Sequence, residues 1–449
     1  MRGPLRHRFV RDVALTSGTQ FVKAALAMVA GIVVARYYGP SARGTVSVLV
    51  ALGSMTVLLG SLGLHQSSVY FMGRYAEKRE QVVSNNMVVG AVGGVVIAVC
   101  LLAVGLLLHE QILGGISSGL FAVYVVSVPF LYFNTFAQRI VLGAGRVTGF
   151  NIADLVEGSA LLVGTVAALA LFGTDLTPLI MIRVLVELSI AAALIVYIHR
   201  LIRFRFSVSA PQLHEQLTYG LRNYAASLLW LFLLQSDIVL CNYFLGSAQT
   251  GVYSVAVSLG LPVTMLASAV GTLIFQRTSA QQSRELRIAN TNRALRLLVP
   301  LAALPMLVFG LLAGWLVPLI YGDRFQPAAT ALILLLPGLL AFSLEIVVMN
   351  FLAGEGSPPI IYLAPLAGLV LNVAANLYVI PRWGINGAAV TSSVAYTVVL
   401  VLVLRYYVGS TGSSLRALLV VRRDDVAALA GSTKALSRQR SDRPQAAAS

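Results

Sequence analysis

The stretch ARYYGPSARGTVSVLVALG, residues 35–53, decides the fold because the chain contains it twice. It predicts the end of one apolar helix, a tight Gly-Pro turn and the start of the next helix. The stretch NYFLGSAQTGVYSVAVSLG, residues 242–260, repeats it with seven identities in nineteen positions, where about two are expected by chance. A second, shorter pair of similar segments is LGAGR, residues 142–146, and AGEGS, residues 353–357. We interpret the chain as an internal repeat, in which the second half has the same organisation as the first.

The composition indicates that both halves lie in a membrane. The chain is 58% hydrophobic and 11% charged, with a mean hydropathy of +0.84, whereas soluble domains carry about 25% charged residues. The net charge of +15 is typical of membrane loops beside an anionic leaflet, so it predicts no nucleic-acid partner. The two cysteines lie in separate apolar runs, which excludes a disulfide framework and a cysteine metal site.

Apolar segments of about 20 residues or more predict the membrane spans. Six come before a polar connector and six after it, so we expect an all-α polytopic membrane protein with about twelve helices in two six-helix lobes. An even number of helices per half gives a parallel repeat. The segments are 13–38, 44–72, 87–108, 118–142, 147–172, 177–199, 217–245, 251–275, 293–318, 327–352, 358–379 and 384–408.

The positive charges of the loops predict the orientation. Seventeen Lys and Arg fall on the side of the N-terminus before the tail, against four on the other side, which are Arg36, Arg43, Arg324 and Arg382. Both termini are therefore expected in the cytoplasm. The expected parts are a basic N-terminus (1–12), an N-lobe (13–199), a cytoplasmic connector (200–216), a C-lobe (217–408) and a basic cytoplasmic tail (409–449) that is disordered or loosely helical.

The sequence offers no catalytic constellation, so we expect no enzyme, no metal site and no cofactor. The five His are scattered and no phosphate-binding Gly-Lys-Ser/Thr loop is present. Ionisable residues at membrane depth are expensive and are functional candidates by default. The candidate cations of a substrate cavity are Lys23, Arg183 and Arg222. The candidates for ion coupling or charge balance are Asp154, Glu157, Glu187, Asp237 and Glu345.

Two interpretations of the N-lobe charges stay open at this point. Lys23, ten residues past Val13, lies about 15 Å along its helix and so close to the midplane, where a cation facing an aqueous cavity would suit an anionic substrate. Alternatively, Asp154 or Glu157 holds Lys23 in place, and Arg183 neutralises a carboxylate four residues further on, because buried charges are usually paired.

The C-lobe candidates have ordinary alternatives too. Arg222 is predicted near the inner end of the seventh helix, where its side chain could equally reach the lipid headgroups. Asp237 is predicted near the outer end of the same helix, where it could only cap the adjoining turn. For Glu345 we expect a role in ion coupling or charge balance.

Motifs in both halves carry a resemblance to a known family. ARYYGPSARG is followed by GLHQSSVYFMGR (63–74) and, in the second half, by SDIVLCNYFLGSAQTGVYSVAVSL (236–259). Two further motifs are LIYGDRFQPAATALILLLPGLLAFSLEIVVMNFLAGEGSP (319–358) and NVAANLYVIPRWGINGAAVTSSVAYTVVL (372–400). In order and spacing they resemble the bacterial polysaccharide flippases of the multidrug/oligosaccharidyl-lipid/polysaccharide (MOP) exporter superfamily.

The resemblance implies a flippase that moves a lipid-linked oligosaccharide or polysaccharide precursor to the outer leaflet by alternating access. It implies the bacterial inner membrane, coupling to a proton or sodium gradient, and as partners the lipid-linked substrate, membrane lipids, a polymerase and glycosyltransferases. One rival is a cation-coupled small-molecule or drug exporter of the same superfamily. A second rival, a membrane polymerase or glycosyltransferase, requires a large catalytic outer loop, and the sequence provides none.

Overall fold

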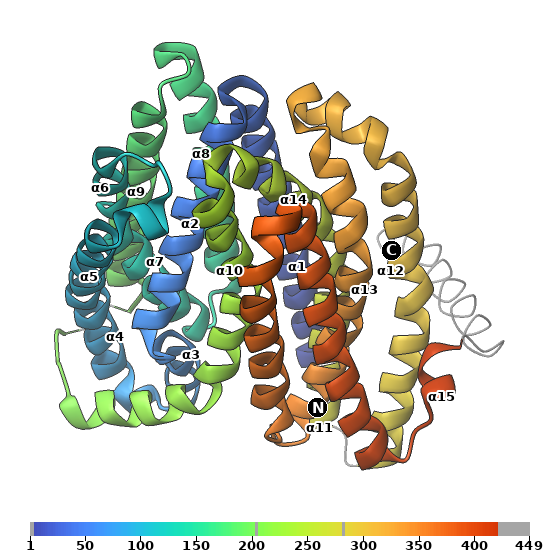
Figure 1. The fold of residues 1–449 in the computed structure, drawn as a ribbon. Helices are drawn as coiled ribbons and strands as arrows, with labels where there is room; N and C mark the ends of the chain where they lie inside the picture. Colours follow the sequence, from blue (N-terminus) through green and yellow to red (C-terminus); the bar gives the residue numbers. More distant parts are fainter. Residues whose placement is uncertain (1–3, 203–204, 281–282, 421–449) are drawn as a thin grey trace, which may run out of the picture.

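The structure is a computed structural model, which describes residues 4–202, 205–280 and 283–420. These residues form helices and turns, and no strand occurs among them. Figure 1 shows the helices standing side by side, with most of the first half of the chain on the left and most of the second half on the right. The predicted all-α fold is confirmed.

The N-lobe contains nine α-helices because three of its predicted spans are each built from two consecutive pieces. The span predicted at 44–72, for example, breaks at Leu62 and Gly63, which both have a positive φ. The helices are α1 (Pro4–Val33), α2 (Gly39–Ser61), α3 (Leu64–Arg74), α4 (Arg79–Val88), α5 (Gly94–Leu107), α6 (Ser118–Val125), α7 (Val128–Gly143), α8 (Val147–Phe172) and α9 (Leu176–Ile202).

The C-lobe has fewer and longer helices because two of them bend instead of ending. Within α10 the bend is at Gly246 (φ 76°), and within α14 it is at Gly384 (φ 58°). Among the described residues nine apolar stretches could cross a membrane, and three of these, of 47, 53 and 52 residues, are long enough to cross twice. The helices are α10 (Ala210–Gly260), α11 (Thr264–Ala280), α12 (Arg284–Tyr321), α13 (Pro327–Gly354), α14 (Ile360–Thr411) and α15 (Leu415–Leu419).

The repeat found in the sequence is also a repeat of backbone conformation. Gly39 and its counterpart Gly246 have φ values of 88° and 76°, and Gly145 and Gly356 have 76° and 117°. A residue with a Cβ would be strained at each of these positions. The glycines therefore match because both halves make the same turns.

The most extensive contact between the two lobes is a seam between α2–α3 and α10. A further contact is the hydrogen bond that Arg36 donates to the carbonyl of Leu319 at 2.9 Å. A Cβ on Gly44 would overlap the carbonyl oxygen of Ser247, and a Cβ on Gly251 would overlap that of Pro40. Gly44 and Gly251 are counterparts in the repeat, so this contact lies where the two halves meet symmetrically. Small residues at such positions let helix backbones approach closely.

The same seam continues to the other end of the molecule. Gly63 and Gly220 approach closely enough that a Cβ on either would lie 2.5 or 2.6 Å from the other's carbonyl oxygen. The Tyr224 hydroxyl donates a hydrogen bond to the carbonyl of Leu59 at 2.6 Å. The lobes are therefore joined at both ends on the α10 side.

The surface around the bundle is apolar. Leu107, Leu171 and Leu311 are 81%, 74% and 76% exposed. Water disfavours such side chains and hydrocarbon does not, so they are suited to contact lipid.

The first part of the tail is partly helical. Of the two alternatives for the tail, disorder does not hold for residues 409–420, because α14 continues to Thr411 and α15 packs against α12. Leu418 is fully buried, and Arg296 donates a hydrogen bond to the carbonyl of Ala417 at 2.7 Å. Residues 421–449 lie outside the described residues. The predicted connector is also partly helical, since α10 already begins at Ala210.

Candidate functional site

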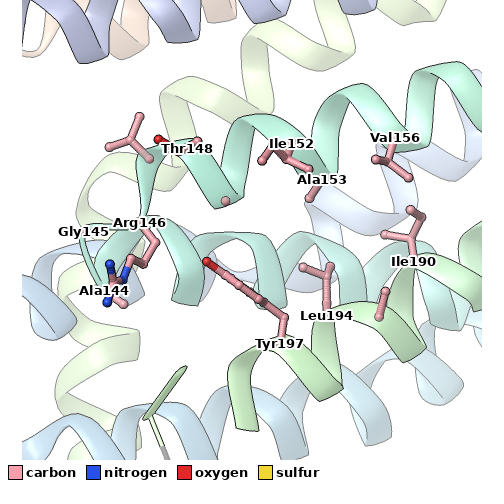
Figure 2. A pocket seen from close by; sticks show the side chains of 13 residues that line it. Ala144, Gly145, Arg146, Thr148, Ile152, Ala153, Val156, Ile190, Leu194 and Tyr197 are labelled. Carbon is pink, nitrogen blue, oxygen red and sulfur yellow. The ribbon is translucent and has the colours of Figure 1, made fainter. Parts of the chain in front are cut away.

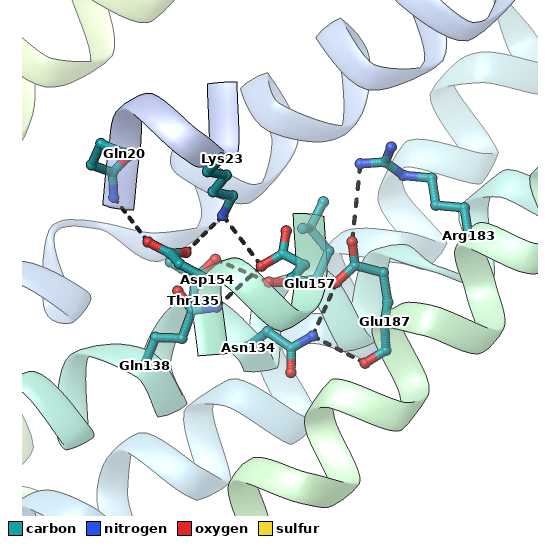
Figure 3. A network of polar contacts seen from close by, with 10 residues as sticks. Gln20, Lys23, Asn134, Thr135, Gln138, Asp154, Glu157, Arg183 and Glu187 are labelled. Carbon is teal, nitrogen blue, oxygen red and sulfur yellow. Dashed lines mark hydrogen bonds and ion pairs between the residues drawn. The ribbon is translucent and has the colours of Figure 1, made fainter. Parts of the chain in front are cut away.

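Charged side chains from α1 and α8 meet inside the N-lobe (Figure 3). The ammonium of Lys23 donates to Asp154 Oδ1 at 2.7 Å and to Glu157 Oε2 at 3.3 Å. Asp154 and Glu157 are three residues apart on α8 and so lie on one face of the helix. The structure thus brings together the three residues that the sequence suggested as partners.

Amide side chains complete this network. Gln20 donates to Asp154 at 2.8 Å, and Gln138 donates to Glu157 at 3.2 Å. These hydrogen bonds hold the carboxylates in fixed positions. The sequence analysis missed both amides, because nothing in their sequence context distinguishes them from other polar residues on a helix.

A second pair of charges lies on α9. Arg183 Nη2 is 4.0 Å from Glu187 Oε1, and Asn134 of α7 donates to Glu187 Oε2 at 3.0 Å. The predicted pairing of Arg183 and Glu187 is therefore present as a loose contact. The Glu187 side chain is fully buried, whereas that of Arg183 is 21% exposed.

The cations of the N-lobe are more exposed than the acids with which they pair. Lys23 is 31% exposed, but its partners Asp154 and Glu157 are only 4% and 13% exposed. The cations thus lie at the surface of a cavity, and the acids lie behind them in the helix bundle. A ligand in the cavity meets the positive side of each pair first.

This cavity, of about 610 Å³, lies between the lobes and is called the central cavity below. Its N-lobe wall carries Lys23, Arg43 and Arg183. Its C-lobe wall carries the hydroxyls of Ser258 and Ser268. None of the described residues that line it is acidic, so its polar lining is suited to an anionic group.

Arg43 corrects an expectation of the sequence analysis, which counted it among the outer loop residues. Because α2 begins at Gly39, Arg43 lies in the second turn of that helix, and its side chain lines the central cavity. Its Nη2 donates to Ser258 Oγ of the other lobe at 2.7 Å. The signal that could have located it is the Gly-Pro pair, since Pro is favoured in the first turn of a helix.

A second hollow, of about 660 Å³, lies between α1 and α11. It shares Met265 and Ser268 with the central cavity. Its lining combines the polar Thr16, Ser17 and Gln20 with apolar side chains. The two hollows together form an amphipathic path from the bundle surface to the cavity cations.

The C-lobe contains a different polar cluster around Asp237, which is 2% exposed. Tyr253 and Ser392 each donate a hydroxyl hydrogen bond of 2.6 Å to Asp237 Oδ2. The side chain lies between α10 and α14 and does not cap a turn, so the alternative of a turn cap is excluded, and the role in coupling or charge balance stays a prediction. Among the described residues, no Lys or Arg forms an ion pair with it.

Two asparagines of α14 extend this cluster. Asn372 donates to Ser392 at 3.3 Å, and Asn376 donates to Asn372 at 3.1 Å. Within the described ranges, Asp237 Oδ1 and Asn376 Oδ1 have no hydrogen-bond partner. Buried oxygens without a donor are costly, so the fold carries two uncompensated polar atoms in this cluster.

Two predicted residues remain, Glu345 and Arg222. Glu345 of α13 is 1% exposed, and its Oε1 has no hydrogen-bond partner in the described part of the chain. It makes no recorded contact with Asp237. The side chain of Arg222 lies outside what the structure describes, so its predicted place in the cavity stays a prediction.

Solved structures with a similar fold are transporters. The chain resembles the lipid II flippase MurJ in an inward closed conformation, with a TM-score of 0.73 and 13% identity over 90% of this chain and 89% of that one. It also resembles an inward-facing multidrug resistance MATE family transporter of the MOP superfamily, with a TM-score of 0.67 and 16% identity over 88% and 96%. At these identities the likeness shows the fold alone.

Sequence comparison identifies the family. A protein of Haloferax volcanii described as a flippase for low-salt glycan biosynthesis is 27% identical over 176 residues, which are 38% of this chain and 37% of that protein. The family model described as "Polysaccharide biosynthesis protein" matches residues 33–330, well over half of the chain. The chain therefore belongs to the polysaccharide biosynthesis protein family, and its fold is that of the MOP-superfamily transporters.

Proposed function

We propose that the protein is an alternating-access flippase, which moves a lipid-linked oligosaccharide or polysaccharide precursor from the inner to the outer leaflet. The observation that carries this proposal is the central cavity, where Lys23, Arg43 and Arg183 face the space and the acids lie behind them. Cations in a site shielded from bulk water bind phosphate strongly. The phosphate that links sugar to lipid is the expected ligand.

The amphipathic path supports a lipid-linked substrate. A headgroup can follow the polar residues between α1 and α11, such as Thr16 and Gln20. The lipid tail stays outside beside exposed side chains such as Phe21, which is 60% exposed. A soluble substrate would not need a lateral route with an apolar rim.

Flipping is tested in proteoliposomes with a fluorescent lipid-linked oligosaccharide. Lys23→Ala, Arg43→Ala and Arg183→Ala should each lower flipping about tenfold or more, because each removes a charge contact to the phosphate. Lys78→Ala is the matched control, since Lys78 pairs with Glu215 at 2.9 Å outside the cavity. Thermal unfolding of each variant checks that it is folded.

The rival exporter of cationic compounds predicts the opposite ranking. In that case Asp154→Asn and Glu157→Gln abolish transport, while folded variants of the cavity cations remain active. This result would replace the flippase proposal with export of cations. The present geometry favours the flippase, because the carboxylates are only 4% and 13% exposed behind Lys23.

We further propose that a coupling cation, a proton or a sodium ion, binds in the C-lobe at Asp237. A buried carboxylate without a counter-charge is stable only when it is protonated or holds a cation. Asp237 fits this description, and the free oxygens of Asp237 and Asn376 supply ligands of the kind that hard cations prefer.

Gradient-driven transport tests this assignment. Asp237→Asn should flip substrate passively but should no longer respond to an imposed sodium or pH gradient. Glu345→Gln is the matched control, because Glu345 is equally buried in the same lobe but, among the described residues, forms no hydrogen bond with the Asp237 cluster. If Glu345→Gln loses the response and Asp237→Asn keeps it, the coupling site is at Glu345.

The expected setting is the bacterial inner membrane with both termini in the cytoplasm. The excess of Lys and Arg in the loops at the N-terminal side supports this orientation. Glycosyltransferases that build the substrate and a polymerase that consumes it are the expected partners. A cysteine at Arg79 should react with an impermeant thiol reagent only after the membrane is opened, whereas one at Arg324 should react in intact cells.

A further inference from the structure

The N-lobe has another hollow that the transport proposal does not use. This groove, of about 790 Å³, lies between α8 and α9 beside the turn that connects α7 to α8 (Figure 2). Small residues on the facing surfaces, among them Gly149, Ala153 and Ala193, leave the space. We call it the α8–α9 groove.

The groove is separate from the central cavity. Ile152 and Val156 line the groove, whereas Asp154 and Gly158 face the charged network or the cavity. Positions two residues apart on a helix point about 200° apart, so groove and cavity lie on opposite faces of α8. Ile152 and Val156 are 55% and 49% exposed, which places the groove on the lipid-facing side of the lobe.

One end of the groove is polar and positively charged. Figure 2 shows Arg146, Thr148 and the hydroxyl of Tyr197 at this end. Arg146 is exposed, and among the described residues its guanidinium forms no hydrogen bond or ion pair. The Tyr197 hydroxyl lies over Gly149, where a Cβ would be only 2.6 Å from it. None of the described lining residues is acidic, so this end is suited to an anion.

The rest of the groove is an apolar trough whose length is similar to the thickness of one bilayer leaflet. From Arg146 to Val156, α8 rises about 15 Å, which is half of the roughly 30 Å hydrocarbon core of a bilayer and so one leaflet. Ile190 and Leu194 of α9 form the opposite wall. A charged end at headgroup level and a trough one leaflet deep match a lipid that lies along the helices.

We propose that the α8–α9 groove binds an anionic glycerophospholipid, with the phosphate on Arg146 and Tyr197 and one acyl chain along Ile152 and Val156. This lipid would brace the two helices that carry the charged network on their other faces. Binding of lipid to the folded state would raise its thermal stability. The proposal does not depend on which substrate the central cavity carries.

The test uses the full chain in detergent micelles without transport substrate. Phosphatidylglycerol should stay bound in native mass spectrometry and raise the Tm, whereas phosphatidylcholine should do neither. Arg146→Gln should weaken phosphatidylglycerol binding about tenfold, since a charge-assisted contact is lost. Arg146→Lys should restore part of it, and Ala153→Leu, which fills the trough, should also reduce binding.

Arg405→Gln is the matched control, because Arg405 is an exposed arginine of the C-lobe outside this groove. An Arg146→Gln variant that binds phosphatidylglycerol as tightly as the wild type would overturn the proposal. An equal loss in Arg405→Gln would overturn it as well, since binding would then follow net charge alone. A polyprenyl phosphate that displaces phosphatidylglycerol at a tenth of its concentration would reassign the groove to the transport substrate.

Discussion

The charged network of the N-lobe and the Asp237 cluster of the C-lobe occupy two halves of one repeat, yet they are chemically different. The N-lobe pairs its acids with Lys23 and Arg183, and these cations reach the central cavity. The C-lobe surrounds Asp237 with hydroxyls and amides and, among described residues, no ion-pair partner. The repeat therefore preserves the scaffold and leaves the chemistry of each lobe free to diverge.

The positions equivalent by the repeat show how far this divergence goes. Under the offset that matches Gly39 to Gly246, Lys23 corresponds to Trp230. Trp230 packs against Phe342, with ring centroids 4.9 Å apart. A charge in one lobe is thus an aromatic contact in the other. This difference is consistent with the division of roles proposed above, in which the N-lobe binds the substrate through its cations and the C-lobe binds the coupling cation at Asp237.

The largest expected effect is on the stability of the N-lobe. Lys23→Met should destabilise the protein by about 2–3 kcal/mol, because it leaves Asp154 and Glu157 without their counter-charge; this is below the 3–5 kcal/mol of fully buried pairs, since Lys23 is partly exposed. Thermal unfolding in detergent measures the loss. Adding Asp154→Asn to Lys23→Met should recover part of it. A double variant less stable than Lys23→Met would show that the charges are not coupled.

The second prediction concerns the cation of the C-lobe. If sodium is the ion, it should stabilise the wild type by about 1.4 kcal/mol at ten times its Kd, and Asp237→Asn should abolish this gain. The asparagine should fold well because Tyr253 and Ser392 can still donate to its oxygen. Calorimetry with sodium and with potassium measures the difference. Sodium stabilisation that persists in Asp237→Asn but vanishes in Asp154→Asn would move the ion to the N-lobe.

The smallest effect is expected at the hydrogen bond between Arg43 and Ser258, which joins the two lobes. Ser258→Ala removes the hydroxyl that accepts a hydrogen bond from Arg43 of the other lobe. The loss should destabilise the state in which the two lobes are in contact by about 1 kcal/mol, which is roughly a fivefold change in the population of that state. Cysteines at Ser41 and Ser247, whose hydroxyl oxygens are 2.9 Å apart, report closure through their rate of cross-linking in a Cys100→Ser, Cys241→Ala background. Ser268→Ala is the control, and an equal change there would exclude a specific role for Ser258.

The sequence by itself determined the membrane setting, the twelve-span repeat and the glycines that make its turns. These properties follow from local signals, namely apolar runs of bilayer length and glycines at positive φ, which any folded context must respect. The pairs Lys23–Asp154 and Arg183–Glu187 could also be anticipated, because charges at membrane depth need partners.

Only the tertiary structure decided which charges face the central cavity. Arg43, expected in an outer loop, lies in the cavity wall, and Asp237, for which coupling and a turn cap were both open, lies in a buried cluster. The amides Gln138 and Asn376 entered the two sites without any signal in the sequence. The physical reason is that the facing of a side chain depends on where each helix begins and on which helix packs against it. The choice of packing partner is set by contacts between residues more than a hundred positions apart.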